Sequence, residues 1–260
     1  MKNKKHEVTC LKLSKTFLGR QLRVVFSFLI DGLVVDGGPA MAKRKLQKYY
    51  QTNQVDQAVF THCHEDHAGN IDLFNSLGIL PYVHSLAIPY LASPPTIPLY
   101  RRVVWDSPAA GAAQAIGSII ETDRYKFKVL ATPGHAPDHI CLYEEKQGWL
   151  FTGDLYIGER AIYLYSEEHL PTVRKSLEFL STLDFSTIFC SHLGAVEKGP
   201  ETIKRKLSYY DNLQEKAHRL KEMGLSTAEI TKRLLGKEDY MYMISRGEFS
   251  KGGLMKALLS

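Results

Sequence analysis

Three histidines and one aspartate lie within six consecutive positions of this chain, at His62, His64, Asp66 and His67. Neutral imidazole and carboxylate groups are the ligands that Zn²⁺ takes outside cysteine sites. A catalytic zinc ion keeps three protein ligands and one open position, so four such groups exceed what one ion needs. The spacing therefore predicts two metal ions side by side. Iron and manganese accept the same ligand types, so the residues leave the identity of the metal open.

A third candidate ligand for the first ion lies seventy residues further along the chain. The run 125–130 alternates as a strand and leads into Thr-Pro-Gly, whose proline and glycine predict a sharp turn that exposes His135. We expect His135 to complete a first metal site with His62 and His64.

The second ion has its own candidate ligands at two further strand ends. Asp154 follows Thr-Gly at the end of a predicted hairpin, and its two carboxylate oxygens suit a bridge between two cations. The β-prone run 187–192 ends in His192. We expect His192 to complete a second site with Asp66 and His67.

Three more residues near these motifs have open roles. Asp36 precedes Gly-Gly-Pro, and it is either an ordinary turn aspartate or a group that orients a ligand histidine. His139 stabilises its loop, reaches a reaction intermediate, or is a core histidine. Cys63 lies between two candidate ligands, but on a strand its side chain points the opposite way, so we do not expect it to bind metal.

Two zinc ions about 3.5–4 Å apart share a water molecule and lower its pKa enough to hold hydroxide near neutral pH. Such a hydroxide attacks an ester or thioester carbonyl, or a phosphorus. Asp66 is the candidate catalytic residue, because a carboxylate between metal and nucleophile can orient the hydroxide or take up a proton.

The segments that position these residues alternate between strands and helices. The dipeptide Asp31-Gly32 predicts a tight hairpin, and Ser226 with Glu229 forms a capping box at a helix start. The expected strands are 7–13, 20–30, 33–35, 55–60, 80–84, 125–130 and 187–192 with a hairpin over 139–153, and the expected helices are 40–51, 67–77, 201–223 and 226–236.

Residues 88–115 are the least regular part of the chain. A long connection of this kind in a compact domain is usually a lid or binding loop, or is mobile, and we expect it to wall the substrate pocket. Its prolines, which exclude a long helix, and its aromatic and basic residues are Pro89, Tyr90, Pro94, Pro95, Pro98, Tyr100, Arg101, Arg102, Trp105 and Pro108.

Composition indicates an ordinary soluble globular protein of 260 residues, with 44% hydrophobic and 23% charged residues. Four scattered cysteines without a C-x-x-C motif or secretory leader predict a reduced, cytoplasmic location. No run approaches the roughly 18 apolar residues of a membrane span. The net charge is +5, and residues 201–260 hold 12 Lys/Arg against 8 Asp/Glu. This excess allows an anionic partner such as RNA, or is simply a solvated helical face.

Taken in chain order, these motifs resemble those of the metallo-β-lactamase superfamily over residues 7–195. The resemblance implies an α/β fold (α+β in some schemes), a four-layer αβ/βα sandwich of two mixed β-sheets with outer helices and a site along one edge. It implies the same seven ligands for two zinc ions, with Asp154 as the bridge. We divide the chain into a catalytic domain, 1–199, and a helical C-terminal segment, 200–260, which packs on the core or contributes to a homodimer.

The motifs at His135 and Asp154 are most similar to those of glyoxalase II-like thioesterases and lactamase-like endoribonucleases. The chain departs from the family at Ser191-His192-Leu193, where Gly-His-Gly is common, and it has no equivalent of the glutathione-binding domain of glyoxalase II. The bridging aspartate argues against antibiotic hydrolysis. Tyr156 lies near, but not in register with, the tyrosine that lactonases place after the bridge.

These observations predict a dinuclear metal-dependent hydrolase that acts on a small-molecule ester, thioester or lactone. The alternative is a metal-dependent endoribonuclease or phosphodiesterase, which the basic C-terminal segment favours.

Overall fold

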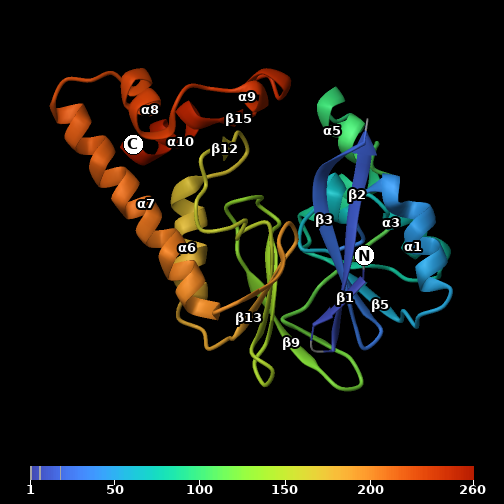
Figure 1. The fold of residues 1–260 in the computed structure, drawn as a ribbon. Coiled ribbons are helices and arrows are strands. Elements are labelled where there is room, and N and C mark those ends of the chain that lie inside the picture. Colours follow the sequence, from blue (N-terminus) through green and yellow to red (C-terminus); the bar gives the residue numbers. More distant parts are fainter. Residues whose placement is uncertain (1, 6, 18) are drawn as a thin grey trace.

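Two β-sheets face each other in the computed structural model, and helices cover the outer side of each (Figure 1). The model describes residues 2–5, 7–17 and 19–260. The two sheets are mixed, with antiparallel and parallel strand pairs in both. The predicted four-layer sandwich is therefore confirmed.

The first sheet contains seven strands in chain order. Its first four strands pair antiparallel, and β4 to β7 pair in parallel because helical segments connect them. The strands are β1 (Lys2–Lys5), β2 (Val8–Phe17), β3 (Arg20–Ile30), β4 (Leu33–Val35), β5 (Gln57–Val59), β6 (Tyr82–Val83) and β7 (Gln114–Ala115). The helices are η1 (Ala40–Ala42), α1 (Lys43–Tyr50), α2 (Glu65–Ala68), α3 (Ile71–Ser76), α4 (Ala87–Ala92) and α5 (Leu99–Trp105).

The second sheet has six strands in the order β14-β13-β11-β10-β9-β8, and β12 pairs separately with β15. The strands are β8 (Ile119–Glu121), β9 (Lys126–Ala131), β10 (Ile140–Glu144), β11 (Trp149–Gly153), β12 (Leu164–Tyr165), β13 (Thr187–Cys190), β14 (Gly194–Glu197) and β15 (Phe249–Ser250). The helices are α6 (Leu170–Leu180), α7 (Gly199–Glu222), α8 (Thr227–Leu235), α9 (Tyr240–Ile244) and α10 (Lys251–Leu259).

Aromatic side chains fill the space between the two sheets. The ring of Phe28 on β3 lies 5.5 Å from that of Phe151 on β11 and 5.6 Å from that of Phe189 on β13. All three are buried, and the rings of Phe151 and Phe189 stack at 4.6 Å. This packing fixes the sheets face to face, so that strand ends from both sheets lie at a common edge.

Backbone hydrogen bonds join the two sheets at that edge. The Phe26 N–H of β3 donates to the Ser191 carbonyl, which follows β13, at 2.6 Å. The Ile140 N–H of β10 donates to the Thr61 carbonyl, which follows β5, at 2.8 Å. The segments that carry the candidate ligands are therefore connected through the main chain.

The expected helices are found, with several differences. The predicted helix 67–77 is divided into α2 and α3 around Gly69 and Asn70, and α4, α5 and α6 were not predicted. The capping box of Ser226 and Glu229 is confirmed at the start of α8. Within the described part of the chain, we find no helix that combines the length and apolar character needed to cross a membrane.

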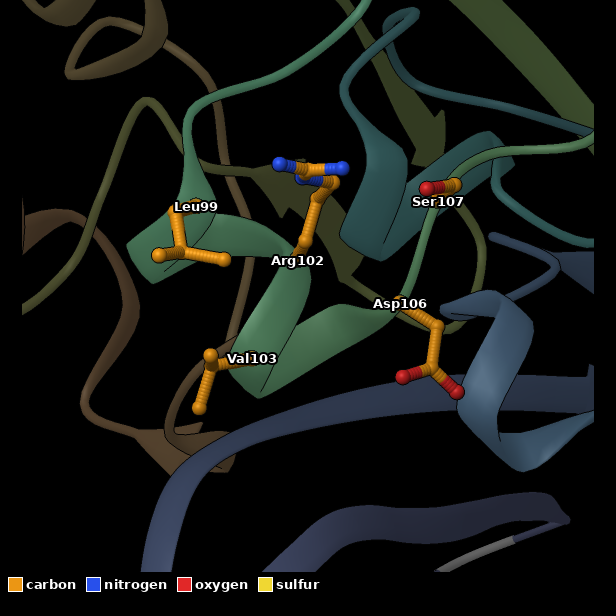
Figure 2. Close-up of a pocket in the computed structure, with 5 residues that line it drawn as sticks. All are labelled: Leu99, Arg102, Val103, Asp106 and Ser107. Atoms are coloured by element: carbon orange, nitrogen blue, oxygen red, sulfur yellow. The ribbon is translucent and has the colours of Figure 1, made fainter.

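The irregular region 88–115 contains the two short helices α4 and α5. The latter borders a hollow of about 360 Å³ (Figure 2). Its lining residues are Leu99, Arg102, Val103, Asp106 and Ser107, none of which is a candidate ligand.

The C-terminal helices cover the outer face of the second sheet. Ile203 and Leu213 of α7 and Leu254 of α10 are buried in one apolar cluster with Leu177 of α6 and Ile188 of β13. The segment 200–260 therefore shares its core with the sheet. The division of the chain at residue 199 stays a prediction.

Lys206 of α7 is buried within this cluster, with only 3% of its surface exposed. Its ammonium donates to the Gly158 carbonyl at 3.0 Å and lies over the rings of Tyr156 and Tyr210 at 5.8 and 5.4 Å. Burial lowers the pKa of Lys206 to about 8, although the charges of Glu168 and Cys190 oppose this shift.

We expect Lys206→Met to stabilise the protein more at pH 7 than at pH 10. Between about pH 8 and 10.5 the unfolded chain binds more protons than the folded one, so the wild-type free energy of unfolding rises by up to about 1.4 kcal/mol per pH unit. The variant lacks this rise. Urea unfolding from pH 7 to 10 measures the difference, with the exposed Lys204→Met as control. Parallel pH profiles for wild type and the Lys206 variant would contradict the prediction.

Candidate metal centre

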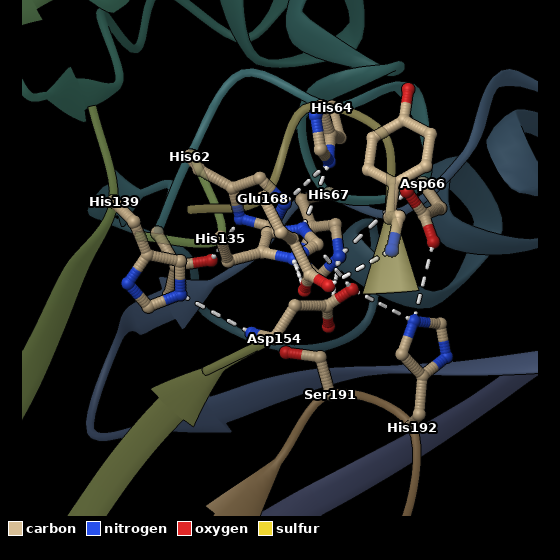
Figure 3. A network of polar contacts seen from close by, with 12 residues as sticks. His62, His64, Asp66, His67, His135, His139, Asp154, Glu168, Ser191 and His192 are labelled. Carbon is tan, nitrogen blue, oxygen red and sulfur yellow. Dashed lines mark hydrogen bonds and ion pairs between the residues drawn. The ribbon is translucent and has the colours of Figure 1, made fainter. Parts of the chain in front are cut away.

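Three buried imidazoles converge at the edge shared by the two sheets (Figure 3). His62 Nε2 lies 3.0 Å from His64 Nδ1, and His135 Nε2 lies 3.1 Å from the same nitrogen. The predicted first group is thus brought together, although His135 comes from the loop after β9 and the other two follow β5. Three nitrogens so close to one another could hold one metal ion.

The second predicted group, Asp66, His67, Asp154 and His192, lies directly beside the first. His192 Nε2 is 3.1 Å from Asp154 Oδ2 and 3.5 Å from Asp66 Oδ2. His67 Nε2 is 3.3 Å from Asp154 Oδ1 and 3.7 Å from Asp66 Oδ1. These four side chains also could hold a metal ion.

The carboxylate of Asp154 faces both groups. Its Oδ2 lies 3.7 Å from His135 Nε2 in the first group and 3.1 Å from His192 Nε2 in the second. Asp154 follows Gly153, which has a φ of +47°, a conformation that favours glycine. A Cβ at this position would also lie only 2.6 Å from His139 Nε2. The tight turn after β11 thus delivers the carboxylate between the two groups.

The other ring nitrogen of several of these histidines binds an acceptor on the protein. His67 Nδ1 lies 2.8 Å from Asp36 Oδ2, His135 Nδ1 lies 2.8 Å from Glu168 Oε1, and His192 Nδ1 lies 2.6 Å from the Val24 carbonyl. A carbonyl or carboxylate accepts, so each outer nitrogen carries the proton. The inner nitrogen of a neutral ring then presents its lone pair to the centre.

The nitrogen and oxygen atoms that face the centre are arranged to bind a cation rather than to hydrogen-bond with one another. His67 Nε2 and Asp154 Oδ1 are buried, face each other at 3.3 Å, and have no hydrogen-bond partner among the described residues. Two acceptors at this distance repel unless a proton or a metal ion lies with them. Burial lowers the pKa of His67, but the carboxylates of Asp154, Asp66 and Asp36 outweigh burial and raise it well above its usual value. The centre therefore attracts positive charge.

Asp36 connects the ligand loop to both sheets. Its carboxylate is fully buried and accepts hydrogen bonds from the Thr61 N–H, the Thr61 hydroxyl and the Ser191 hydroxyl at 2.8 to 3.0 Å. It also contacts His67 Nδ1. Of the two readings of this residue from sequence, these contacts favour the one in which it orients a histidine.

His139 contacts the backbone beside the centre. Its Nε2 accepts the Asp154 N–H at 3.2 Å, and its Nδ1 lies 2.9 Å from the Thr132 hydroxyl. Burial lowers the pKa of His139 well below its usual value, which keeps the ring neutral and able to accept. Its contacts favour the loop-stabilising role.

Tyr156 lies apart from the two groups, in the apolar cluster beneath α7. Tyr165 of β12 is instead the tyrosine beside the centre, with its ring 5.9 Å from that of His64 and 6.4 Å from that of His135. Tyr165 and Glu168 were both missed from sequence. The one local signal was the acidic pair Glu167-Glu168 before α6, which is common on solvated surfaces.

Two mixed sheets with a cluster of histidines and aspartates at their shared edge define a candidate metal centre. A model of the metallo-beta-lactamase superfamily matches residues 20–192, and the chain belongs to that family. Membership and the histidine/aspartate cluster together imply binding of a divalent metal.

Two of the similar proteins bear the names of hydrolases, and a solved structure shares the fold. The thioesterase pkgB of Emericella nidulans is 30% identical over 177 residues, which cover 66% of this chain and 45% of pkgB. The hydroxyacylglutathione hydrolase of Legionella pneumophila is 26% identical over 150 residues, which cover 56% of this chain and 52% of that protein. This chain thus spans about half the length of each. The metallo-beta-lactamase family protein TTHA1429 of Thermus thermophilus matches with a TM-score of 0.71 and 20% identity, over 97% of this chain and 93% of its own.

We expect Asp36→Asn to weaken metal binding by about 10- to 100-fold, which is typical for loss of the acceptor behind a ligand histidine. Asparagine tolerates the φ of +61° at this position, but an amide N–H turned toward His67 Nδ1–H removes an acceptor. Competition with a chromogenic chelator measures the affinity, and Asp123→Asn at an exposed position is the control. Unchanged affinity in a folded Asp36 variant would contradict the orienting role.

Proposed function

We propose that this protein is a dinuclear zinc hydrolase that cleaves a small-molecule thioester. The observation that carries the proposal is the Asp154 carboxylate, whose oxygens face the nitrogens of both histidine groups. A carboxylate that lies between two groups of ligand atoms, each facing the centre, supports a pair of metal ions rather than a single ion.

The ligands of the first ion would be His62, His64 and His135, and those of the second Asp66, His67 and His192, with Asp154 shared. Two bound divalent ions supply a Lewis-acidic pair that lowers the pKa of water and polarises a carbonyl oxygen. The chain's own contribution is to hold these side chains in one tautomer and orientation through Asp36, Glu168 and the Val24 carbonyl.

Asp66 is the proposed catalytic residue. Its side chain is 11% exposed against 6% for that of Asp154, so it is the more accessible of the two carboxylates. One oxygen faces His67 and the other faces His192. A carboxylate in this place can orient the attacking water and take up its proton, which the leaving thiolate then receives.

A thioester is favoured because two relatives bear names of thioester chemistry, a thioesterase and a hydroxyacylglutathione hydrolase. Loss of a thiolate needs little help from an acid, since thiols have a pKa near 8.5. A cytoplasmic location, where such substrates occur beside reduced cysteines, stays a prediction.

Metal analysis of protein purified without added metal should give about two zinc ions per chain. The same protein should hydrolyse acyl thioesters in preference to lactones, bis-p-nitrophenyl phosphate and single-stranded RNA. Preference for either phosphodiester would favour the alternative, a nuclease or phosphodiesterase. Turnover that survives complete metal removal would contradict the mechanism.

Asp154→Asn should lower the metal content to one ion or less and reduce kcat/KM by more than the roughly 10- to 100-fold expected for a residue behind a ligand. The amide keeps the size of the side chain but removes the charge shared by the two groups. A variant that retains two ions and full activity would rule out the bridge.

A further inference from the structure

A buried ion pair ties α5 to the loop that carries the ligands. Glu65 stands between His64 and Asp66, and its side chain is only 2% exposed. Arg101 of α5 binds it with two parallel contacts, Nε to Oε1 at 2.6 Å and Nη2 to Oε2. Such a two-pronged pair fixes the guanidinium plane and not only its charge.

The third nitrogen of the same guanidinium reaches the other half of the molecule. Arg101 Nη1 donates to the Tyr165 hydroxyl on β12 at 2.6 Å. The Tyr165 ring lies against His64 and His135 on one side and stacks on Phe249 of β15 at 5.0 Å. One side chain thus connects the ligand loop, α5 and the C-terminal strand pair.

The rest of α5 spans the centre. The Tyr100 hydroxyl donates to Glu248 Oε2 beside β15, and the Trp105 ring at the other end of the helix lies 6.5 Å from that of His192. Helix α5 therefore reaches from the first ligand group, near His64, to the second, near His192. Figure 1 shows α5 at the same end of the molecule as α9 and β15.

Arg101 does not itself contact the groups that orient the ligands, although the Tyr165 N–H also donates to Glu168 Oε2 at 3.1 Å. The outer nitrogens of His67, His135 and His192 bind Asp36, Glu168 and the Val24 carbonyl, and none of them contacts Arg101. Loss of Arg101 should release the wall of the site without releasing the ligands.

We propose that Arg101 is a positioning residue that holds α5 and Tyr165 as one wall of the substrate site and thereby sets substrate affinity. This inference rests on the proposed hydrolase function. Substrate binding depends on a wall held in place before the substrate arrives, because ordering a loose segment would consume binding free energy.

The test compares Arg101→Met, Arg101→Lys and the double variant Glu65→Gln/Arg101→Met with Arg219→Met. The double variant is needed because removal of Arg101 alone leaves the Glu65 carboxylate buried without its partner, which destabilises the fold. Arg219 is the control, because it lies on α7 outside residues 88–115, and its side chain is 72% exposed and pairs with Glu215.

We expect the double variant to raise KM for an acyl thioester about tenfold or more while kcat changes by less than about threefold. It should keep the wild-type metal content, and proteases should cut residues 93–108 faster. Arg101→Lys should raise KM by an intermediate factor, because lysine keeps the charge but not the planar fork. Arg219→Met should match the wild type in all three measurements.

Unchanged KM and unchanged proteolysis in a folded double variant would overturn the proposal, and so would loss of metal, which would assign Arg101 to ligand support instead. Failure of the proposed function is distinguishable from these outcomes. It would appear as a wild-type protein that binds metal but cleaves no thioester. Proteolysis of 93–108 would then still decide whether Arg101 holds the wall.

Discussion

The mutual repulsion of acceptor atoms is the constraint on which this structure depends. His67 Nε2 and His192 Nε2 point at the oxygens of Asp154 and Asp66, while their outer nitrogens carry protons already committed to Asp36 and the Val24 carbonyl. Such an arrangement is unfavourable without positive charge at its centre. The rest of the fold must supply the free energy that holds these groups close together. A cation that relieves their repulsion therefore binds favourably.

Packing and hydrogen bonds between the two sheets supply that free energy. Edge-to-face contacts of Phe28 with Phe151 and Phe189 set the face-to-face geometry, and main-chain hydrogen bonds at Phe26 and Ile140 join the ligand-bearing strand ends directly. Asp36 adds buried contacts to Thr61 and Ser191, which follow strands of opposite sheets. Ligand geometry therefore depends on core packing far from the metal, and the ligand loops are not free to adjust one by one.

The fold and the proximity of the seven candidate ligands could be predicted from the sequence because both depend on patterns of residues that are close together in the chain. His62, His64, Asp66 and His67 are adjacent in the chain, and His135, Asp154 and His192 each follow a recognisable strand. Tyr165, Glu168 and the partnership of Arg101 with Glu65 carry no such local pattern. They matter through contacts across 33, 36 and 64 positions, which only the assembled core brings about, and their residue types are common on ordinary surfaces. The split between α2 and α3 has a local cause instead, because a Cβ at Gly69 would clash with the Glu65 carbonyl in the turn between the two helices.

Part of the positive charge of the C-terminal segment has a structural explanation that does not involve a nucleic acid. Lys206 is buried beneath the loop that follows Asp154, where its ammonium and the Tyr209 hydroxyl bind the carbonyls of Gly158 and Ala161. Other basic residues of the segment pair with carboxylates: Lys204 with Glu201, Arg205 with Glu159, Arg219 with Glu215 and Lys251 with Asp239. Phosphate binding needs cations that are free to replace counterions along a strand. Five of the 12 Lys/Arg residues of this segment hold a loop or neutralise neighbouring carboxylates, so these five are poorly suited to that task, and Lys206 instead supports the loop that follows Asp154 from behind.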